Sequence, residues 1–211
     1  MSAQTSAADI RVLLFDVGGV LVELGGINTL LGWLDHRISV DEVWRRWLES
    51  VPVRQFETGR IEAPEFAAGV IAEFGLAVEP QEFLDSFIGW PTGLYPGALE
   101  MLSRIPPRYR RALLSNSNSL HWPRMLGEMG LGAAVDTHFV SHLIGRVKPD
   151  RGTFEHVLAA LDCRPAQMLF FDDNALNIEA ARALGIQAVH VLGVAQTRQA
   201  LIEWEVFNRE P

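Results

Sequence analysis

Residues 12–19 read Val-Leu-Leu-Phe-Asp-Val-Gly-Gly, and this stretch decides the fold class. Four consecutive apolar residues, 12–15, are typical of a strand that is buried on both faces of a parallel sheet. Asp16 follows where the strand should end, and Gly18-Gly19 break the pattern. Ligands of open parallel sheets bind beyond the carboxyl ends of the strands, so Asp16 is a candidate site residue.

The chain after residue 94 repeats this pattern of a short apolar run followed by a helical segment. Helical periodicity separates the runs and follows the last one, and it is clearest around Phe154, Val157 and Leu161. Strands that alternate with helices predict an α/β fold, a doubly wound Rossmann-like parallel sheet. The further predicted strands are 112–114, 138–140, 168–171 and 188–192.

Residues 27–90 show helical periodicity and no strand candidate. Breakers such as Val51-Pro52, Glu79-Pro80 and the segment 91–93 divide this stretch into several short helices. The apolar side chains that we expect on buried helix faces are Trp44, Trp47 and Leu48 in one helix and Phe66, Val70 and Phe74 in another. We therefore predict a core of residues 1–25 and 94–211 with a helical insertion at 26–93.

Composition narrows the class of protein. The 211 residues are 48% hydrophobic and 21% charged, which is ordinary for a globular chain, and the formal net charge of −8 disfavours nucleic acid and anionic membranes as partners. Cys163 is the only cysteine, so no internal disulfide can form. Residues 1–9 lack the layout of a signal peptide, and no apolar run could span a bilayer, so we expect a cytoplasmic protein.

Polar residues follow three of the predicted strands. Asp16 ends the first, Ser115-Asn116 the second, and Asp172-Asp173 the fourth, while Lys148 precedes a predicted helix. Carboxylates suit a hard cation such as Mg²⁺, and hydroxyl, ammonium and backbone amide groups suit phosphate oxygens. At one edge of a sheet these groups predict a site for a cation and a phosphate.

The same residues carry a family resemblance. The segments 15–21 (Phe-Asp-Val-Gly-Gly-Val-Leu), 114–116 (Leu-Ser-Asn), 147–149 (Val-Lys-Pro) and 171–178 (Phe-Asp-Asp-Asn-Ala-Leu-Asn-Ile) resemble, in order, the four motifs of the haloacid-dehalogenase-like hydrolase superfamily. The helical insertion sits where that superfamily places its first-type (C1) cap. Residues 57–61 (Glu-Thr-Gly-Arg-Ile) and the Pro-Gly after the cap are similar to the bacterial sugar-phosphate (glucose-1-phosphate) phosphatase branch.

The resemblance implies a magnesium-dependent phosphatase that acts on a small phosphorylated metabolite, with sugar phosphates as candidates. Asp16 would attack phosphorus and form an aspartyl-phosphate that water then hydrolyses. Mg²⁺ would be held by Asp16, the Gly18 carbonyl and Asp173, with Asp172 beside it or positioning waters. Lys148 would neutralise the nucleophile and a phosphate oxygen. The phosphoryl group would be bound by Ser115, the amide of Asn116 and the amides of Val17 and Gly18.

One position departs from the pattern of the superfamily's phosphatases, which usually carry a second aspartate, a general acid and base, two residues after the nucleophile. This chain has Gly18 there, as do members of the sugar-phosphate branch. General acid–base groups are worth about 10²–10⁴-fold in rate, so we expect the rate to depend steeply on leaving-group acidity. If it does not, another residue supplies the proton, and His121 is the first candidate.

Two other functions fit the same motifs. A 2-haloacid dehalogenase also uses an aspartate nucleophile, but that chemistry has no use for Mg²⁺, so Asp172-Asp173 argues against it. A catalytically weak binding or regulatory protein could keep the fold, because fold alone does not establish function. Hydrolysis of an aryl phosphate with and without Mg²⁺ discriminates between the three.

Overall fold

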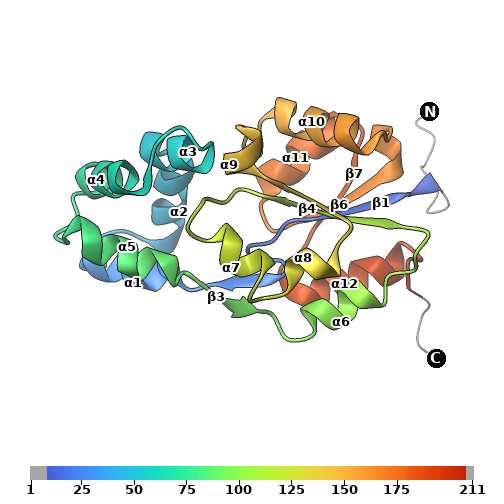
Figure 1. The fold of residues 1–211 in the computed structure, drawn as a ribbon, viewed down its shortest axis with the longest axis horizontal. Helices are drawn as coiled ribbons and strands as arrows, with labels where there is room; N and C mark the ends of the chain where they lie inside the picture. The colour runs from blue at the N-terminus through green and yellow to red at the C-terminus, as the bar shows by residue number, and fades with distance from the viewer. Residues whose placement is uncertain (1–8, 208–211) are drawn as a thin grey trace.

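The computed structural model describes residues 9–207 and has a five-stranded parallel sheet at its centre (Figure 1). The strand order is β5-β4-β1-β6-β7, so the first strand lies in the middle of the sheet. The strands are β1 (Val12–Phe15), β4 (Arg110–Ser115), β5 (Thr137–Val140), β6 (Met168–Asp172) and β7 (Gln187–His190). The predicted doubly wound α/β fold is confirmed, and the predicted strands fall within two residues of those observed.

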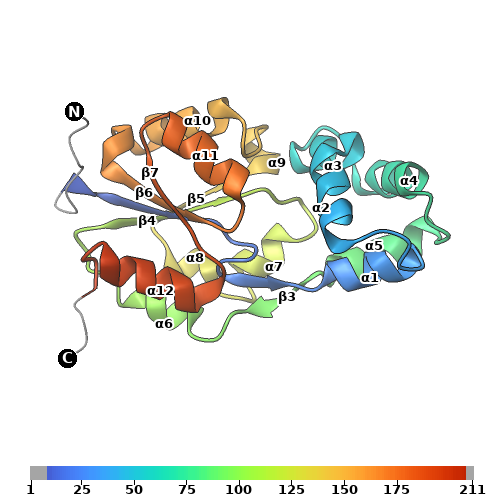
Figure 2. The ribbon, with the colours of Figure 1, turned by 180° about the vertical axis from the view of Figure 1, so that it is seen from behind.

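Helices cover both faces of this sheet, as Figures 1 and 2 show from opposite sides. Side chains of a strand alternate between faces, and β1 accordingly sends Leu13 and Phe15 into one hydrophobic cluster and Val12 and Leu14 into the other. The first cluster includes residues of α6 (Ala98–Ser103), α7 (Trp122–Leu126), α8 (Leu131–Ala134) and α12 (Gly193–Glu203). The second includes residues of α10 (Arg151–Leu161) and α11 (Ala175–Ala183). Two shorter elements are α9 (Ser141–Ile144) and a 3₁₀ turn at Pro165–Gln167.

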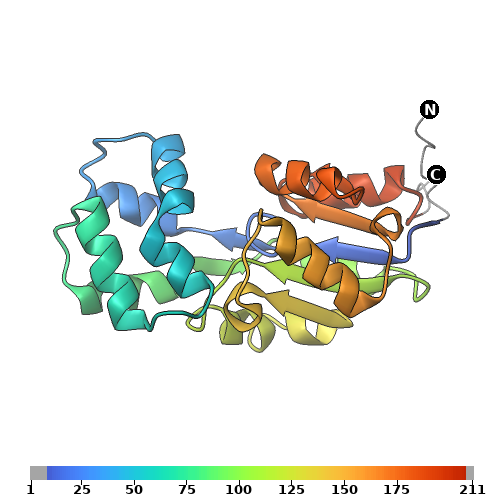
Figure 3. The same ribbon diagram turned by 90° about the horizontal axis from the view of Figure 1, so that it is seen from above.

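A separate group of helices lies beyond one end of the sheet, as Figure 3 shows from above. It comprises α1 (Gly26–Trp33), α2 (Val40–Glu49), α3 (Val51–Glu57), α4 (Ala63–Phe74) and α5 (Pro80–Ile88). These helices share a third hydrophobic cluster, in which Phe66 stacks on Phe56 with ring centroids 4.3 Å apart. Of the residues predicted to face inward on α2, only Trp47 is buried, whereas Trp44 is 38% and Leu48 is 51% exposed. That expectation was wrong for Trp44 and Leu48, because the one buried stripe of α2 runs through Val43 and Trp47.

The sequence reading missed two strands that connect the helical group to the core. β2 (Val22–Leu24) pairs antiparallel with β3 (Pro91–Leu94), although the sequence pattern predicts only a helix break at residues 91–93. A two-stranded ribbon tolerates proline because each strand has a free edge that needs no amide donor. Neither strand has a pattern of its own, since each is defined by a partner about 70 residues away in the chain.

Among residues 9–207, no helix is long and apolar enough to cross a membrane. Residues 1–9, whose composition is unlike that of a signal peptide, lie outside the described residues except for Asp9.

Candidate functional site

The carboxyl ends of three neighbouring strands bring the predicted site residues together. Asp16 directly follows β1, Ser115 ends β4 and Asp172 ends β6, and these strands lie side by side in the order β4-β1-β6. Lys148, in the segment between α9 and α10, reaches the same edge, where its Nζ contacts both Asp16 and Asp172. The prediction placed these groups at one edge of the sheet, and the geometry agrees.

Lys148 forms the centre of a buried charge cluster. Its Nζ lies 2.7 Å from Asp16 Oδ1 and 2.7 Å from Asp172 Oδ2, and its side chain is 2% exposed. Burial would lower the pKa of Lys148, but the two carboxylates outweigh that effect and hold the pKa above its usual range. Lys148 therefore stays charged and supplies a fixed positive charge beside Asp16.

Burial raises the pKa of Asp16 well above its usual range, against the opposing effect of the Lys148 ammonium. Asp172 and Asp173 raise it further by repulsion. The single ammonium of Lys148 thus lies near three carboxylates, those of Asp16, Asp172 and Asp173. One positive charge does not balance three negative charges, so the ionised form of Asp16, which is the form that can act as a nucleophile, is disfavoured. A cation bound among these groups would correct that imbalance.

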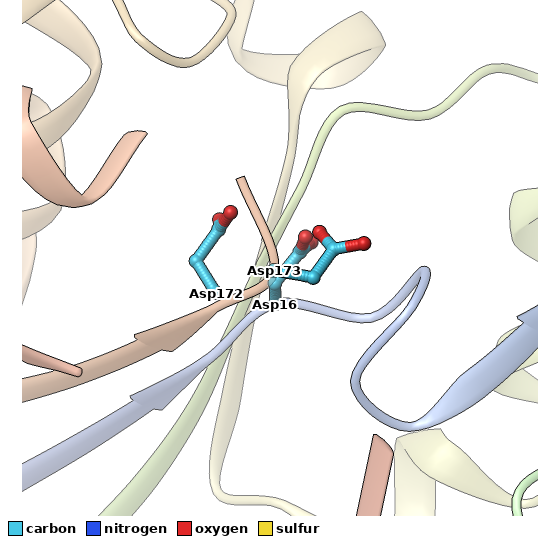
Figure 4. A group of neighbouring side chains, drawn as sticks. All are labelled: Asp16, Asp172 and Asp173. Carbon is cyan, nitrogen blue, oxygen red and sulfur yellow. The ribbon is translucent and has the colours of Figure 1, made fainter. Parts of the chain in front are cut away.

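Asp172 and Asp173 are adjacent in sequence but have different surroundings, and Figure 4 shows their side chains leaving the chain in different directions. Asp172 is fully buried and its oxygens are occupied. Besides Lys148, they accept hydrogen bonds from the Asn174 amide at 2.8 Å and from Asn177 Nδ2 at 2.9 and 3.1 Å. Asp172 therefore orients Lys148 and the start of α11, and has little capacity left for a metal.

The Asp173 carboxylate, in contrast, accepts no hydrogen bond from the side chain of another described residue. It is partly exposed, and a ligand oxygen of Asp173 lies within 4.8 Å of one from each of Asp16 and Asp172. Burial, followed by repulsion from Asp172, raises the pKa of Asp173. A carboxylate that accepts no hydrogen bond from another described residue and lies beside a second carboxylate has the chemistry of a ligand for a hard cation.

Two consecutive glycines shape the loop after Asp16. Gly19 has φ +70°, and a Cβ on it would lie 2.0 Å from Asp173 Oδ2, so only glycine fits beneath that carboxylate. Among the hydrogen bonds of the described residues, none uses the amide or carbonyl of Gly18. The Gly18 carbonyl is thus available as a ligand. The Val17 amide, predicted to bind phosphate, donates instead to Asp16 Oδ1 at 2.7 Å, which fixes the orientation of the Asp16 carboxylate.

Ser115 and Asn116 differ in their roles. The Ser115 hydroxyl is buried, and within the described part of the chain it has only a 3.5 Å contact with the Asn116 carbonyl, which leaves it able to bind a ligand. The Asn116 side chain donates to the Lys148 carbonyl at 2.9 Å and accepts from the Lys148 amide at 2.8 Å. It therefore holds the loop of Lys148 in place. The sequence reading missed this contact, as it missed the contact of Asn177 with Asp172, because the partners lie on different segments.

His121 is buried and lies between the core and the helical group. Its Nε2 donates to the Phe87 carbonyl at 2.7 Å, so Nδ1 accepts from Asn118 Nδ2 at 3.2 Å. Burial, more than any other effect, lowers the pKa of His121 to about 4. The ring is neutral at physiological pH with both nitrogens engaged. His121 is 9% exposed, and the neighbouring Trp122 is 3% exposed.

A family model identifies the family of this chain. The model of the haloacid dehalogenase-like hydrolases matches residues 10–185. The chain therefore belongs to the haloacid dehalogenase-like hydrolase family, and it is a hydrolase. The resemblance inferred from the four motifs is confirmed at this level.

Characterised relatives are distant and include two chemistries. The chain is 23% identical over 199 residues to a D-ribitol-5-phosphate phosphatase of Bacteroides thetaiotaomicron, covering 91% of this chain and 97% of that one. It is 26% identical to (S)-2-haloacid dehalogenase 1 of a Pseudomonas species, covering 86% and 84%. A solved family enzyme of B. thetaiotaomicron, in complex with magnesium and inorganic phosphate, has a TM-score of 0.70 at 22% identity and covers 86% of this chain and 93% of that one.

Proposed function

We propose that this protein is a magnesium-dependent phosphatase that hydrolyses a small phosphorylated metabolite through an aspartyl-phosphate on Asp16. The single observation that carries this proposal is the pairing of the Lys148-bound Asp16 carboxylate with the nearby Asp173 carboxylate, which accepts no hydrogen bond from another described residue. A phosphatase needs both a nucleophile and compensation for the charge of the phosphoryl group.

We propose Asp16, Asp173 and the Gly18 carbonyl as the protein ligands of Mg²⁺. All three offer hard oxygen atoms, and none of these is saturated by hydrogen bonds of the described residues. When bound there, Mg²⁺ supplies positive charge to the nucleophile and to the phosphoryl oxygens. Asp172, the weaker of the predicted ligands, acts by holding Lys148.

Residues of this chain carry out the nucleophilic attack, bind the phosphoryl group and offset its charge. Asp16, oriented by the Val17 amide, presents its other oxygen to phosphorus. Lys148 offsets negative charge as the nucleophile and the phosphate approach each other. The Ser115 hydroxyl and the amides of Asn116 and Gly18 are the donors for phosphoryl oxygens. Residues 26–93 act as a cap that shapes the substrate pocket, and the D-ribitol-5-phosphate phosphatase relative supports sugar or sugar-alcohol phosphates as the class.

The test is hydrolysis of para-nitrophenyl phosphate with and without Mg²⁺, followed by a panel of phosphorylated metabolites that includes sugar and sugar-alcohol phosphates. Asp16→Asn should abolish turnover, because an amide is a poor nucleophile and a weaker metal ligand, and it should leave the fold intact. A near wild-type, magnesium-dependent rate in Asp16→Asn would contradict the mechanism.

The similarity to a haloacid dehalogenase supports a second candidate function, the dehalogenation of a 2-haloacid. Dehalogenation forms an ester of the aspartate without a cation, and it would leave the Asp173 carboxylate without a partner. Halide release from a 2-haloacid in the presence of a chelator, with no phosphate release under any condition, would favour that function. Absence of both activities would favour a binding or regulatory protein.

A further inference from the structure

The helical group reaches the catalytic edge of the core through the end of α3. Arg54 of α3 forms an ion pair with Asp150, two residues after Lys148. Gly59, in the turn after α3, packs against α9, where a Cβ on Gly59 would lie 2.4 Å from the His142 carbonyl oxygen. Figures 1 and 2 show α3 beside α9, where the helical group adjoins the core. Glu57, the last residue of α3, lies between these two contacts in the chain, and its carboxyl is close enough to Lys148 for that charge to lower its pKa.

Glu57 is a half-buried acid with no assigned role. Among residues 9–207, no group donates a hydrogen bond to its carboxyl. Burial raises the pKa of Glu57 to about 7, although Lys148 and then Arg54 oppose the shift. Of these cations, Lys148 is bonded to Asp16 and Asp172, and Arg54 to Asp150. His142 of α9 adds no charge, because burial lowers its pKa.

The proposed reaction needs a proton donor that the motifs do not supply. The usual position is Gly18, and His121 is excluded because both its ring nitrogens are engaged and its pKa is about 4. Tyr95 lies near Asp173, but burial, with repulsion from Glu23 and Asp173, raises its pKa and makes it a weaker acid. A leaving group departs on the side of phosphorus opposite the nucleophile. Asp16 attacks from the core, so the leaving oxygen faces the helical group.

We propose that Glu57 is the general acid and base of this hydrolase. This inference rests on the phosphatase function proposed above. In the first step, an Asp16 carboxylate oxygen bonds to phosphorus as the bond from phosphorus to the leaving oxygen breaks. The electron pair of that bond stays on the leaving oxygen, which takes the proton of Glu57 and departs as an alcohol.

In the second step, the Glu57 carboxylate removes a proton from water. The water oxygen bonds to phosphorus, and the bond from phosphorus to Asp16 breaks. Inorganic phosphate leaves, the Asp16 carboxylate is regenerated, and Glu57 is protonated again. An acid that is half-protonated near neutral pH suits both steps, because it must donate in one and accept in the other.

The experiment compares the wild type, Glu57→Gln and Glu57→Asp on phosphate esters of graded leaving-group acidity, at saturating Mg²⁺. We expect Glu57→Gln to lose about 10²–10⁴-fold in kcat on primary alkyl phosphates but less than about threefold on activated aryl phosphates. The wild type should then show a shallow dependence on leaving-group acidity, not the steep one expected from Gly18 alone. Glu57→Asp, which keeps an acid, should recover part of the alkyl rate.

Glu62→Gln is the matched control, because Glu62 is an exposed glutamate five residues away and undergoes the same substitution. It should leave the rates and the leaving-group dependence unchanged. Thermal melts of each variant separate a folding defect from a chemical one. As an independent measurement, carboxyl ¹³C NMR of the protein without Mg²⁺ should show a resonance that titrates near pH 7 and is absent from Glu57→Gln.

A loss in Glu57→Gln that is equal for aryl and alkyl esters would overturn the inference, since it would indicate a role in binding or positioning. A Glu57 carboxyl that titrates near the usual value of about 4.3 would also overturn it, whatever the activity. If the wild type hydrolyses esters, Asp16→Asn does not, and Glu57→Gln is unaffected, the proposed function stands and only this inference fails. If the wild type shows no magnesium-dependent hydrolysis, the proposed function itself fails.

Discussion

Replacing Gly19 with alanine tests whether this glycine positions the Asp173 carboxylate. Gly19 has φ +70°, a conformation that costs an L-residue about 1–2 kcal/mol. For a chain of this length, 1 kcal/mol corresponds to about 2–4 °C in melting temperature, so Gly19→Ala should melt about 2–8 °C lower than the wild type. This part of the effect does not depend on any metal.

The second effect is local to the site. The new methyl carbon would begin 2.0 Å from Asp173 Oδ2, whereas ordinary contact is 3.4–4 Å, so the carboxylate must retreat by more than about 1 Å. A misplacement of about 1 Å in a catalytic group can cost roughly 10²-fold in rate. We therefore expect Gly19→Ala to lower kcat/KM by about 10²-fold and to raise the Mg²⁺ concentration needed for half-maximal rate.

The neighbouring glycine provides a control for stability. Gly18 lacks a positive φ, and a Cβ there would meet only the flexible end of Leu24, which is 45% exposed and free to move. Gly18→Ala should change the unfolding free energy by no more than about 0.5 kcal/mol. Thermal melts and Mg²⁺ titrations of both variants are the assay. An unchanged melting temperature and Mg²⁺ requirement in Gly19→Ala, or equal destabilisation by both substitutions, would refute this reasoning.

Two further predictions test the roles of Asp172, Asp173 and His121. Asp173→Asn should raise the Mg²⁺ requirement with little loss of stability, whereas Asp172→Asn should destabilise the fold by about 2–3 kcal/mol, because Asp172 is a fully buried partner of Lys148 and Asn177. Denaturant unfolding and Mg²⁺ titrations of the two variants test this, and the reverse pattern would contradict it. His121 has a native pKa of about 4 against about 6.5 when unfolded, so the unfolded state binds the extra proton and stability falls as pH drops through this window. Between pH 7 and pH 5 the wild type should lose about 2 kcal/mol from this residue, and His121→Gln should lack that part of the slope.

The sequence determined the fold class and the members of the candidate site. Buried parallel strands are short apolar runs, and strand-end residues meet at one edge whatever the details of packing. Asp16, Ser115, Lys148 and Asp172-Asp173 were therefore found from local patterns alone. The order of the four motifs added the family, which the family model confirmed.

Only the tertiary structure decided what each of these residues contacts. The partners of Asp172 and Asn116 come from other segments. These contacts saturate the Asp172 carboxylate, whereas the adjacent Asp173 carboxylate accepts no hydrogen bond from another described residue. The β2–β3 ribbon likewise exists only because two segments without strand patterns of their own meet. The raised pKa of Glu57 and the lowered pKa of His121 both follow from burial between the core and the helical group. Burial and long-range contacts depend on packing, and local sequence patterns do not encode them.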